Sequence, residues 1–379
     1  MKAEAFSFRG GRGWSAPAFP DLDSEQTLVL VFGGARKVES LPLDALVRAY
    51  PRAHVLGCST AGEILDQAIF DDSLVVAICR FDGTPLRSIF HAIESATDSY
   101  MVGTTIAERL AAADLRGVFV LSDGTKVNGS ELVRGLNSVL PPEVLVTGGL
   151  AGDGDQFSAT WVLDHGKPAG GCVSAIGFYG ERILLGHGSK GGWDVFGPER
   201  TVTRSSGNVL FQIDGVSALD LYKRYLGDLA SGLPANALLF PLRLRRHKTD
   251  AHGLVRTILS IDEKAGSMTF AGDIPEGSLA QFMRANLDRL IDGAAEAARR
   301  TSRSKQEDAQ ESLAIAVSCV GRRLVLAERA EEEIEAVTGI LPSTCRLIGF
   351  YSYGELSPCW DGRCDLHNQT MTLTTLSET

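Results

Sequence analysis

The sequence lacks any apolar run of about 18 residues, which is the length that a membrane-spanning helix needs. Its first residues also lack the apolar core of a secretory signal. Cysteine is sparse, with 7 in 379 residues, and an odd number scattered through a long chain indicates reduced thiols rather than a disulfide framework. We therefore expect a cytoplasmic protein that neither crosses nor binds a membrane.

The sequence also contains fewer basic than acidic residues. The 37 Lys and Arg residues face 47 Asp and Glu residues, which gives a formal net charge of −10. Such a balance repels phosphate and disfavours non-specific binding to nucleic acid, although it leaves room for a local basic pocket. Because 44% of the residues are hydrophobic and 22% are charged, the composition is that of a folded chain with a substantial core.

Familiar enzyme signatures are missing as well. The sequence contains no GxSxG nucleophile elbow, no P-loop and no HExxH metal motif, and GGLAGDG (148–154) does not match the GxGxxG dinucleotide fingerprint. Cys58 follows an apolar strand, where a cysteine acts as a small hydrophobe unless a base lies beside it. We expect no catalytic residue.

One pattern occurs three times, in residues 27–63, 117–153 and 313–355. Each unit has an uninterrupted aliphatic run, an amphipathic helix, a proline and a second aliphatic run. Proline stops a helix, and continuous apolar strands on either side of a helix indicate a βαβ crossover with parallel strands. Each unit then ends in a glycine followed by an acid, at Gly62-Glu63, Gly152-Asp153 and Gly354-Glu355.

Strand, turn, strand and helix patterns precede the second and third units alike, which predicts two related α/β halves. The second half is expected to begin near Leu238, and its first helix to start at Ser278, a suitable N-cap. A β-rich segment (159–213) joins the halves, and Ser217 with Asp220 forms a capping box for the helix after it. The predicted class is α/β, with α+β as the alternative, and mixed sheets layered against helices.

The predicted organisation has three parts. Residues 1–22 are expected to form an N-terminal arm, in which the Gly- and Pro-rich stretch GRGWSAPAFPD (11–21) is loosely held. A first domain follows over residues 23–215, and a second over residues 216–379.

The three glycine-acid turns are the main candidate for a ligand site. A glycine-rich turn at the carboxyl end of a parallel strand exposes backbone N–H groups, and open α/β sheets bind ligands at that edge. Glu63 and Glu355 would contact a cationic or amine group. The alternative is structural, with glycine serving the turn and the acid capping the next segment. The candidate ligand-binding residues are Cys58, Ser59, Thr60, Gly62, Glu63, Gly149, Asp153, Tyr351, Tyr353 and Glu355.

Cysteine and histidine gather near the C-terminus. Cys359, Cys364 and His367 do not have the usual spacing of a zinc site, so we expect no metal. His367 is a candidate axial ligand for haem, which needs one imidazole, and His187 is a second ligand-facing candidate. A histidine that is simply hydrogen-bonded within the fold is the alternative for both.

A single basic cluster, LRLRRHK (242–248), stands out in this acidic chain. Its arginines could hold an anionic ligand such as a carboxylate or a haem propionate. Alternating Leu and Arg equally indicate an exposed strand with one solvated face.

Several segments together resemble the FIST family: VLGCSTAGEI (55–64), GGLAGDG (148–154), GNVLFQIDGVSALDLYKRYLG (207–227), FPL (240–242), RLIGFYSYGELSP (346–358) and LHNQTMTLTTL (366–376). The similarity runs from about Asp23 to Ser377 and makes the two predicted domains FIST N-like and FIST C-like. It implies a sensory module that binds a small ligand, with amino acids as proposed ligands. Some bacterial members bind haem and respond to nitric oxide, acting on histidine kinases or cyclic-di-GMP enzymes.

We therefore expect a non-catalytic sensor that binds an amino-acid-like ligand or haem in a cleft between its halves and signals to a separate protein. One alternative is an enzyme that acts on a small amine or carboxylate, using Cys58, Glu63 or Glu355. The other is a structural or interaction protein in which the turns are packed shut.

Overall fold

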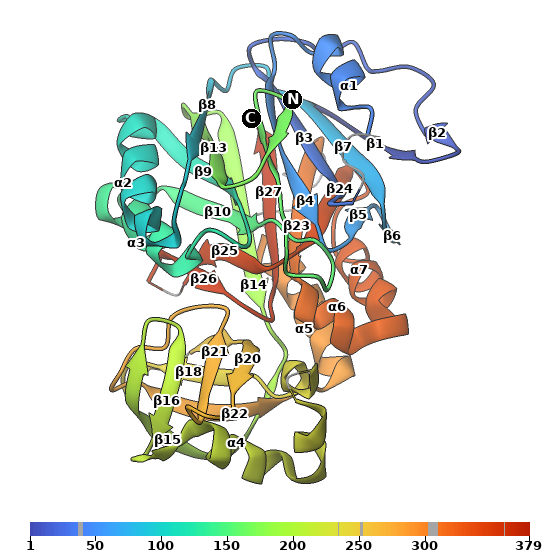
Figure 1. Ribbon diagram of the computed structural model, residues 1–379. Helices are drawn as coiled ribbons and strands as arrows, with labels where there is room; N and C mark the ends of the chain where they lie inside the picture. The colour runs from blue at the N-terminus through green and yellow to red at the C-terminus, as the bar shows by residue number, and fades with distance from the viewer. Residues whose placement is uncertain (37–40, 234, 251–252, 302–309, 360) are drawn as a thin grey trace.

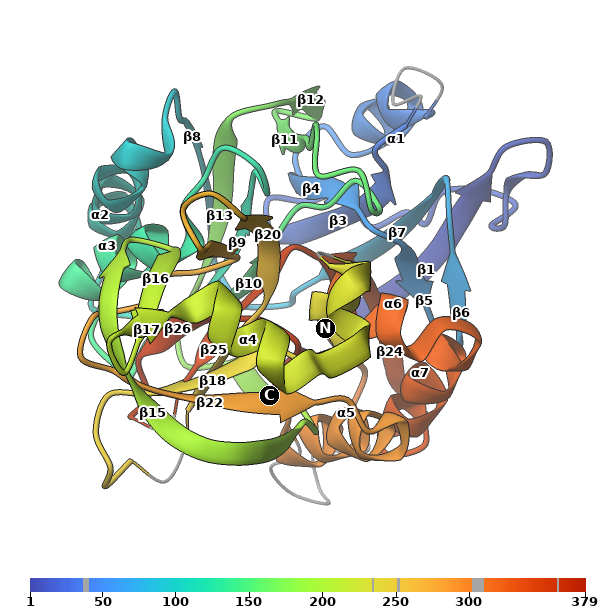
Figure 2. The same cartoon turned by 60° about the horizontal axis from the view of Figure 1, so that its bottom comes forward.

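The structure is a computed structural model that describes residues 1–36, 41–233, 235–250, 253–301, 310–359 and 361–379. Figure 1 shows an α/β body with a smaller β-rich part attached below it, and Figure 2 shows that part from nearer its own side, in front of the body. Within the described residues, no helix is long and apolar enough to span a membrane.

Three of the sheets are built around a parallel pair of strands, which confirms the three predicted βαβ units. The pairs are β3 (Thr27–Gly34) with β4 (His54–Thr60), β9 (Leu115–Ser122) with β10 (Leu145–Leu150), and β23 (Ser312–Cys319) with β24 (Cys345–Ser352). The crossover helices are α1 (Leu43–Ala49), α3 (Gly129–Val139) and, in the third unit, α6 (Val320–Leu326) followed by α7 (Ala330–Thr338).

The three sheets share one strand order. An antiparallel strand lies beside the first strand of each pair, and a further strand lies outside it. The inner strands are β7 (Ser73–Arg80), β13 (Cys172–Tyr179) and β27 (Met371–Glu378); the outer ones are β1 (Lys2–Arg9), which also pairs with β2 (Gly13–Trp14), then β8 (Leu86–Ala92) and β14 (Ile183–Lys190).

A hairpin completes each sheet from the other side, and it always comes from a different unit. Hairpin β5 (Glu63–Leu65) and β6 (Ala68–Phe70) follows the first unit but pairs with β24. Hairpin β25 (Gly354–Pro358) and β26 (Cys364–His367) follows the third unit but pairs with β10. Hairpin β11 (Val162–Asp164) and β12 (Lys167–Ala169) follows the second unit but pairs with β4. This cyclic exchange brings the three glycine-acid turns together.

Hydrophobic side chains of the three sheets meet in one core. Phe32 of β3 and Phe350 of β24 stack with their ring centroids 4.6 Å apart, and Phe119 of β9 belongs to the same buried cluster. Helix α2 (Ser99–Leu110) precedes β9 in the second unit, and α5 (Leu287–Thr301) precedes β23 in the third. The helices lie on the outside of the sheets (Figure 1).

The fourth sheet forms an inserted β domain, residues 194–284, between β14 and α5. It has a hydrophobic core of its own. Helix α4 (Ala218–Leu226) packs in this core, and Ser217 caps it by accepting a hydrogen bond from the Asp220 N–H, as predicted. The strands are β15 (Asp194–Ser206), β16 (Val209–Ile213), β17 (Val216–Ser217), β18 (Leu242–Arg245), β19 (Leu254–Arg256), β20 (Ile258–Asp262), β21 (Ser267–Phe270) and β22 (Leu279–Arg284).

The fold is mixed α/β with mixed sheets layered against helices, as predicted, but three details of the prediction are wrong. The helix expected from Ser278 is strand β22 at first, because Ala280 and Phe282 alternate into the core between β15 and β18; the helix begins at Leu287. The segment taken as the start of the second half, near Leu238, lies inside the inserted β domain. Residues 2–9 are a strand of the first sheet rather than part of an N-terminal arm, because they pair with β7 along their whole length.

Candidate functional site

The three glycine-acid turns are in direct contact. The Ala61 N–H donates to the Tyr351 carbonyl at 2.8 Å, the Gly152 N–H to the Ser59 carbonyl at 3.0 Å, and the Tyr353 N–H to the Leu150 carbonyl at 3.1 Å. Each turn therefore donates a backbone hydrogen bond to one of the other two. The sequence predicted that these turns lie together, and the structure places them so.

Two of the acids act as anchors in the same way. The carboxylate of Glu63 accepts hydrogen bonds from the Thr60 hydroxyl (2.5 Å), the Ser73 N–H (3.1 Å) and the Ser73 hydroxyl (2.7 Å). The carboxylate of Glu355 accepts from the Ser352 hydroxyl (2.9 Å), the Thr370 N–H (3.2 Å) and the Thr370 hydroxyl (2.7 Å). Glu63 thus ties its turn to the first residue of β7, and Glu355 ties its turn to the residue before β27.

Burial also changes the protonation of these two acids. Both side chains are almost completely removed from solvent. Desolvation raises the pKa of Glu63 to about 7 and that of Glu355 to about 8, against the lowering effect of the donated hydrogen bonds. Glu355 is therefore mostly protonated at neutral pH.

Asp153 anchors the second turn through a different partner set. It accepts hydrogen bonds from the Ser158 N–H (2.9 Å), the Ser158 hydroxyl (2.9 Å) and the Ala159 N–H (2.8 Å), and from the Tyr353 hydroxyl. Burial opposes the charge on Asp153, but these hydrogen bonds outweigh it and lower the pKa. All three acids therefore have the capping role that the structural alternative assigned to them.

Four other candidates from the sequence lie in the core. Cys58 is completely buried, and burial raises the pKa of its thiol well above the ordinary value, which disfavours the nucleophilic thiolate form. The Ser59 hydroxyl accepts a hydrogen bond from the backbone N–H of Trp161 at 3.0 Å. The Tyr351 hydroxyl donates to Glu333 at 2.9 Å, and Gly149 allows the side chain of Val317 to pack against its backbone.

A recess of about 460 Å³ opens beside the first turn, and we call it the turn recess. It contains four of the residues that the sequence singled out: Thr60, Gly62, Glu63 and Asp153. The same cavity does not reach Tyr351, Tyr353 or Glu355. Its full lining is Gly34, Ala35, Arg36, Thr60, Ala61, Gly62, Glu63, Asp71, Asp72, Asp153, Gly154, Asp155, Val320, Arg323, Leu324 and Ala327.

Carboxylates outnumber cations in the turn recess. Arg323 of α6 donates to both oxygens of Asp71 at 2.7 Å and to the Ala61 carbonyl at 2.6 Å. Gly62 makes room for this arginine, because a Cβ there would lie 2.3 Å from a guanidinium nitrogen. Asp72 makes no ion pair or side-chain hydrogen bond with any described residue. Among the described residues, the recess therefore holds a carboxylate without an ionic partner, beside the ion pair of Asp71 with Arg323.

The sequence reasoning missed Asp71, Asp72, Arg36 and Arg323. The signal was present in the residues that follow each hairpin, just before the inner strand. These are Asp71-Asp72, Gly170-Gly171 and Asn368-Gln369, and the second member of each pair has a left-handed backbone, with φ of 51°, 67° and 60°. The acid pair occurs in the first unit alone, and that is where the turn recess opens.

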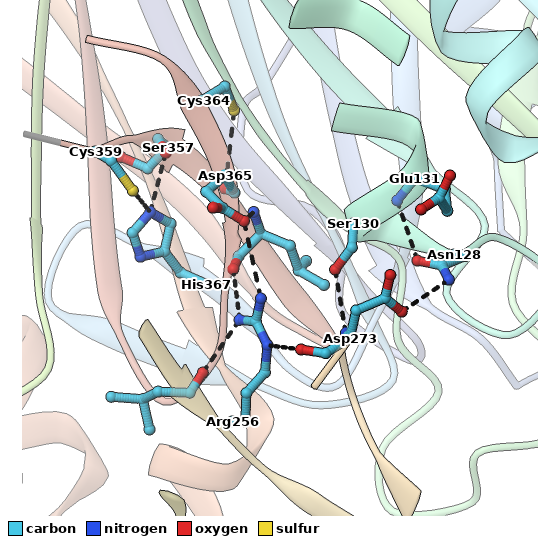
Figure 3. A network of polar contacts seen from close by, with 12 residues as sticks. Asn128, Ser130, Glu131, Arg256, Asp273, Ser357, Cys359, Cys364, Asp365 and His367 are labelled. Atoms are coloured by element: carbon cyan, nitrogen blue, oxygen red, sulfur yellow. Dashed lines mark hydrogen bonds and ion pairs between the residues drawn. The ribbon is translucent and has the colours of Figure 1, made fainter. Parts of the chain in front are cut away.

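A buried arginine joins the inserted β domain to the body (Figure 3). Arg256 of β19 donates to the Leu366 carbonyl at 2.8 Å and to the Asp273 carbonyl at 3.1 Å, and its closest carboxylate oxygen, on Asp365, is 3.8 Å away. Burial lowers its pKa. The side chain of Asn128, at the start of α3, donates to Asp273 at 3.2 Å and completes the contact.

His367 lies at the edge of this contact, and its surroundings do not fit a haem ligand. Burial lowers its pKa, so the ring is neutral, and Nε2 lies 3.0 Å from the Ser357 carbonyl and 3.8 Å from the Cys359 thiol. Because a carbonyl oxygen only accepts, Nε2 carries the proton and is not available to iron. The cavity next to it combines charged side chains and glycines with a few apolar side chains, among them Trp193 and Met283.

No metal-binding group was found in the part of the chain that the structure describes, where no three His, Cys, Asp or Glu side chains could hold one ion. The seven cysteines are all free. Cys364 is buried, and its thiol approaches the Asp365 carbonyl rather than His367.

Comparison with known proteins gives a match to two family models. The FIST N domain matches residues 27–216, and the FIST C domain matches residues 218–358. A search of curated proteins found no match. The turn recess lies between the two matched regions, because its turns belong to the first and α6 to the second.

Among solved structures, the chain is similar to two proteins at low scores. A cyanuric acid hydrolase from A. caulinodans is 10% identical with a TM-score of 0.20, over 78% of this chain and 99% of that one. PurLQS from Thermotoga maritima is 9% identical with a TM-score of 0.18, over 93% of this chain and 66% of that one. Neither similarity is strong enough to carry a conclusion about fold or activity.

Proposed function

Because this chain belongs to the FIST family, with a FIST N domain followed by a FIST C domain, we propose that it is a non-catalytic sensor that binds a small, amino-acid-like ligand in the turn recess. FIST domains are associated with sensory signalling and small-ligand binding. The ligand class, its position and the signalling partner are our proposal.

The observation that supports this proposal most is the charge of the turn recess. Its lining includes five acids, Glu63, Asp71, Asp72, Asp153 and Asp155, and two arginines, Arg36 and Arg323. An excess of carboxylates favours a ligand with an ammonium group. Arg36 also lines the recess, and we propose that it holds the carboxylate of an amino acid.

The recess also offers a way to transmit binding. The ion pair between Arg323 of the FIST C domain and Asp71 of the FIST N domain crosses its wall. An ammonium group beside Asp71 and Asp72 would compete with the guanidinium and favour an arrangement in which α6 is displaced. A ligand shifts such an equilibrium only by the difference in its affinity for the two arrangements.

We propose that a separate cytoplasmic protein reads this change. The resemblance to the family suggests a histidine kinase or a cyclic-di-GMP enzyme as that protein. Haem is not part of the proposal, because the environment of His367 does not suit it.

A thermal-unfolding screen against the twenty amino acids tests the proposal. Binding of a ligand at 100 times its Kd stabilises the folded protein by about 2.7 kcal/mol, so at least one amino acid should raise the Tm by several degrees. Asp72→Asn should abolish this shift, whereas Asp228→Asn, at an exposed position in the inserted β domain, should preserve it. A screen without a hit, or a hit that Asp72→Asn leaves unchanged, would refute the proposed site.

A further inference from the structure

A second, larger cavity lies between the body and the inserted β domain, and we call it the basic cleft. Its volume is about 920 Å³, against about 460 Å³ for the turn recess. One wall comes from the end of β14 and from α5, and the other from β18, β19 and β22. His187, His367 and Arg243 of the basic cluster 242–248, all noted in the sequence, lie in this one cavity.

Close packing of α5 on β14 creates the first wall. A Cβ at Gly188 would lie 2.0 Å from the Ala297 carbonyl, and one at Gly192, where φ is +95°, would lie 2.1 Å from the Arg289 carbonyl. These glycines are therefore explained by packing, and they are not evidence for a phosphate loop. Their effect is to bring the polar face of α5 beside Lys190 at the end of β14.

The charge of the basic cleft is opposite to that of the protein. Its lining contains five cations and two carboxylates, Asp292 and Glu296. The lining residues alone therefore carry an excess of three positive charges. The whole chain carries a net charge of −10. The five cations are Lys190, Arg243, Arg289, Arg299 and Arg300.

Two of these cations have carboxylate partners outside the lining, because Arg289 pairs with Asp194 and Arg243 lies 3.7 Å from Glu199. The other three have little compensation. Lys190 makes no ion pair with a described residue. Glu296 is shared between Arg299, at 3.4 Å, and Arg300, at 3.1 Å, so that one carboxylate serves two guanidinium groups. In a concave site, such an excess of charge attracts anions more strongly than it would on a flat surface.

We propose that the basic cleft binds a small molecule that carries phosphate groups. Several cations spread over one wall suit a ligand with more than one negative charge, and guanidinium groups match phosphate oxygens in pairs. The cavity volume is at the upper end of the range for small-molecule sites. Leu254, Val255 and Met283 form an apolar part of the lining that an organic group can contact. This site is separate from the turn recess and does not depend on the function proposed there.

Isothermal titration calorimetry with ADP and with inorganic pyrophosphate tests this inference on the full chain. We expect binding of at least one of the two, with an affinity that falls as ionic strength rises, because the site is partly exposed. Tighter binding of ADP would identify an organic phosphate as the ligand class, and equal binding would identify the phosphate groups alone. Absence of binding by both would overturn the proposal.

Charge reversal locates the site. The double variant Lys190→Glu with Arg300→Glu should weaken binding at least tenfold, whereas Arg109→Glu on α2, an exposed arginine outside the cleft, should leave it unchanged. Thermal unfolding should show that both variants are folded. Equal affinity of the double variant and the wild type would show that the phosphate binds elsewhere. Asp72→Asn should not affect this binding, which separates a failure here from a failure at the turn recess.

Discussion

Glu63 and Glu355 occupy the same place in two units of one chain. Each carboxylate accepts a hydroxyl three residues earlier in its own turn, and both the N–H and the hydroxyl of one Ser or Thr beyond the following hairpin. The repeated glycine-acid pattern is therefore explained by a buried carboxyl that anchors its turn through the same set of hydrogen bonds in both units. The ligand site that we propose lies beside these anchored turns, at Asp72 in the first unit.

The raised pKa values predict how stability depends on pH. In the unfolded chain both carboxyls have the ordinary pKa of 4.5, whereas in the folded protein the pKa of Glu63 is about 7 and that of Glu355 about 8. At a pH between 4.5 and the folded-state pKa of each group, the folded protein holds a proton that the unfolded chain has lost. The free energy of unfolding should therefore fall as pH rises, by about 1.4 kcal/mol per pH unit for each group.

Glutamine variants separate the two contributions. Between pH 7 and 8 the decline should come mostly from Glu355, so Glu355→Gln should flatten that part of the profile. Below pH 7 both groups contribute, so Glu63→Gln should reduce the slope there by about half and leave the decline above pH 7. Urea unfolding at several pH values measures this, with Glu108→Gln on the exposed side of α2 as the control. A Glu355→Gln profile parallel to that of the wild type would contradict the assignment.

Removal of a donor to Glu355 should destabilise the protein. Thr370→Val deletes a hydroxyl that donates to the buried carboxyl at 2.7 Å and keeps the shape of the side chain. A cost of about 1–3 kcal/mol is expected, because the buried carboxyl loses one of its three hydrogen-bond donors. Thr374→Val is the matched control, since its hydroxyl bonds to no described residue. Equal effects in urea unfolding would show that the Glu355 contact has no special role.

The packing of α5 on β14 should depend on the absence of a side chain at position 188. Gly188→Ala places a methyl group against the Ala297 carbonyl, and overpacking of this kind costs about 1–3 kcal/mol. The variant should also bind phosphate less well, because it moves one wall of the basic cleft. Gly10→Ala, which adds a methyl group with nothing within 4 Å, should have a much smaller effect. Unfolding midpoints that do not differ would contradict this account of the glycine.

Arg256 should fix the inserted β domain to the body. Lys at this position keeps the charge but cannot reach the carbonyls of Leu366 and Asp273 together, so Arg256→Lys should cost about 1–3 kcal/mol. Hydrogen exchange should become faster in β19 and β26 and stay unchanged in β3 and β23. Arg109→Lys serves as the control, and unaltered exchange in β26 would show that the contact is dispensable.

The sequence predicted the elements whose causes are local. Continuous apolar runs, proline stops and amphipathic helices were sufficient to predict three parallel pairs, and the Ser217 cap was visible from its spacing. The helix predicted from Ser278 was wrong because a central strand can also carry Leu and Phe three residues apart. The pairing of β22 with β15 and β18, which makes this segment a strand, is not visible in the local sequence.

The sequence predicted only part of the candidate site. Contact between the turns follows from their common position at strand ends, so Thr60, Gly62, Glu63 and Asp153 were found together. The exchange of hairpins between units depends on long-range pairing that no local pattern contains. It decides that Tyr351 points into the core and that Asp72 and Arg323 line the turn recess.

Hydrogen exchange with the amino acid that most raises the Tm, at saturating concentration, tests the central claim most directly. If that amino acid sits in the turn recess, protection should increase together in residues 60–63, in Asp71 and Asp72, and in α6, with little change in α2 and β8. Protection confined to the inserted β domain, or to any segment outside these three, would contradict the proposed sensor site.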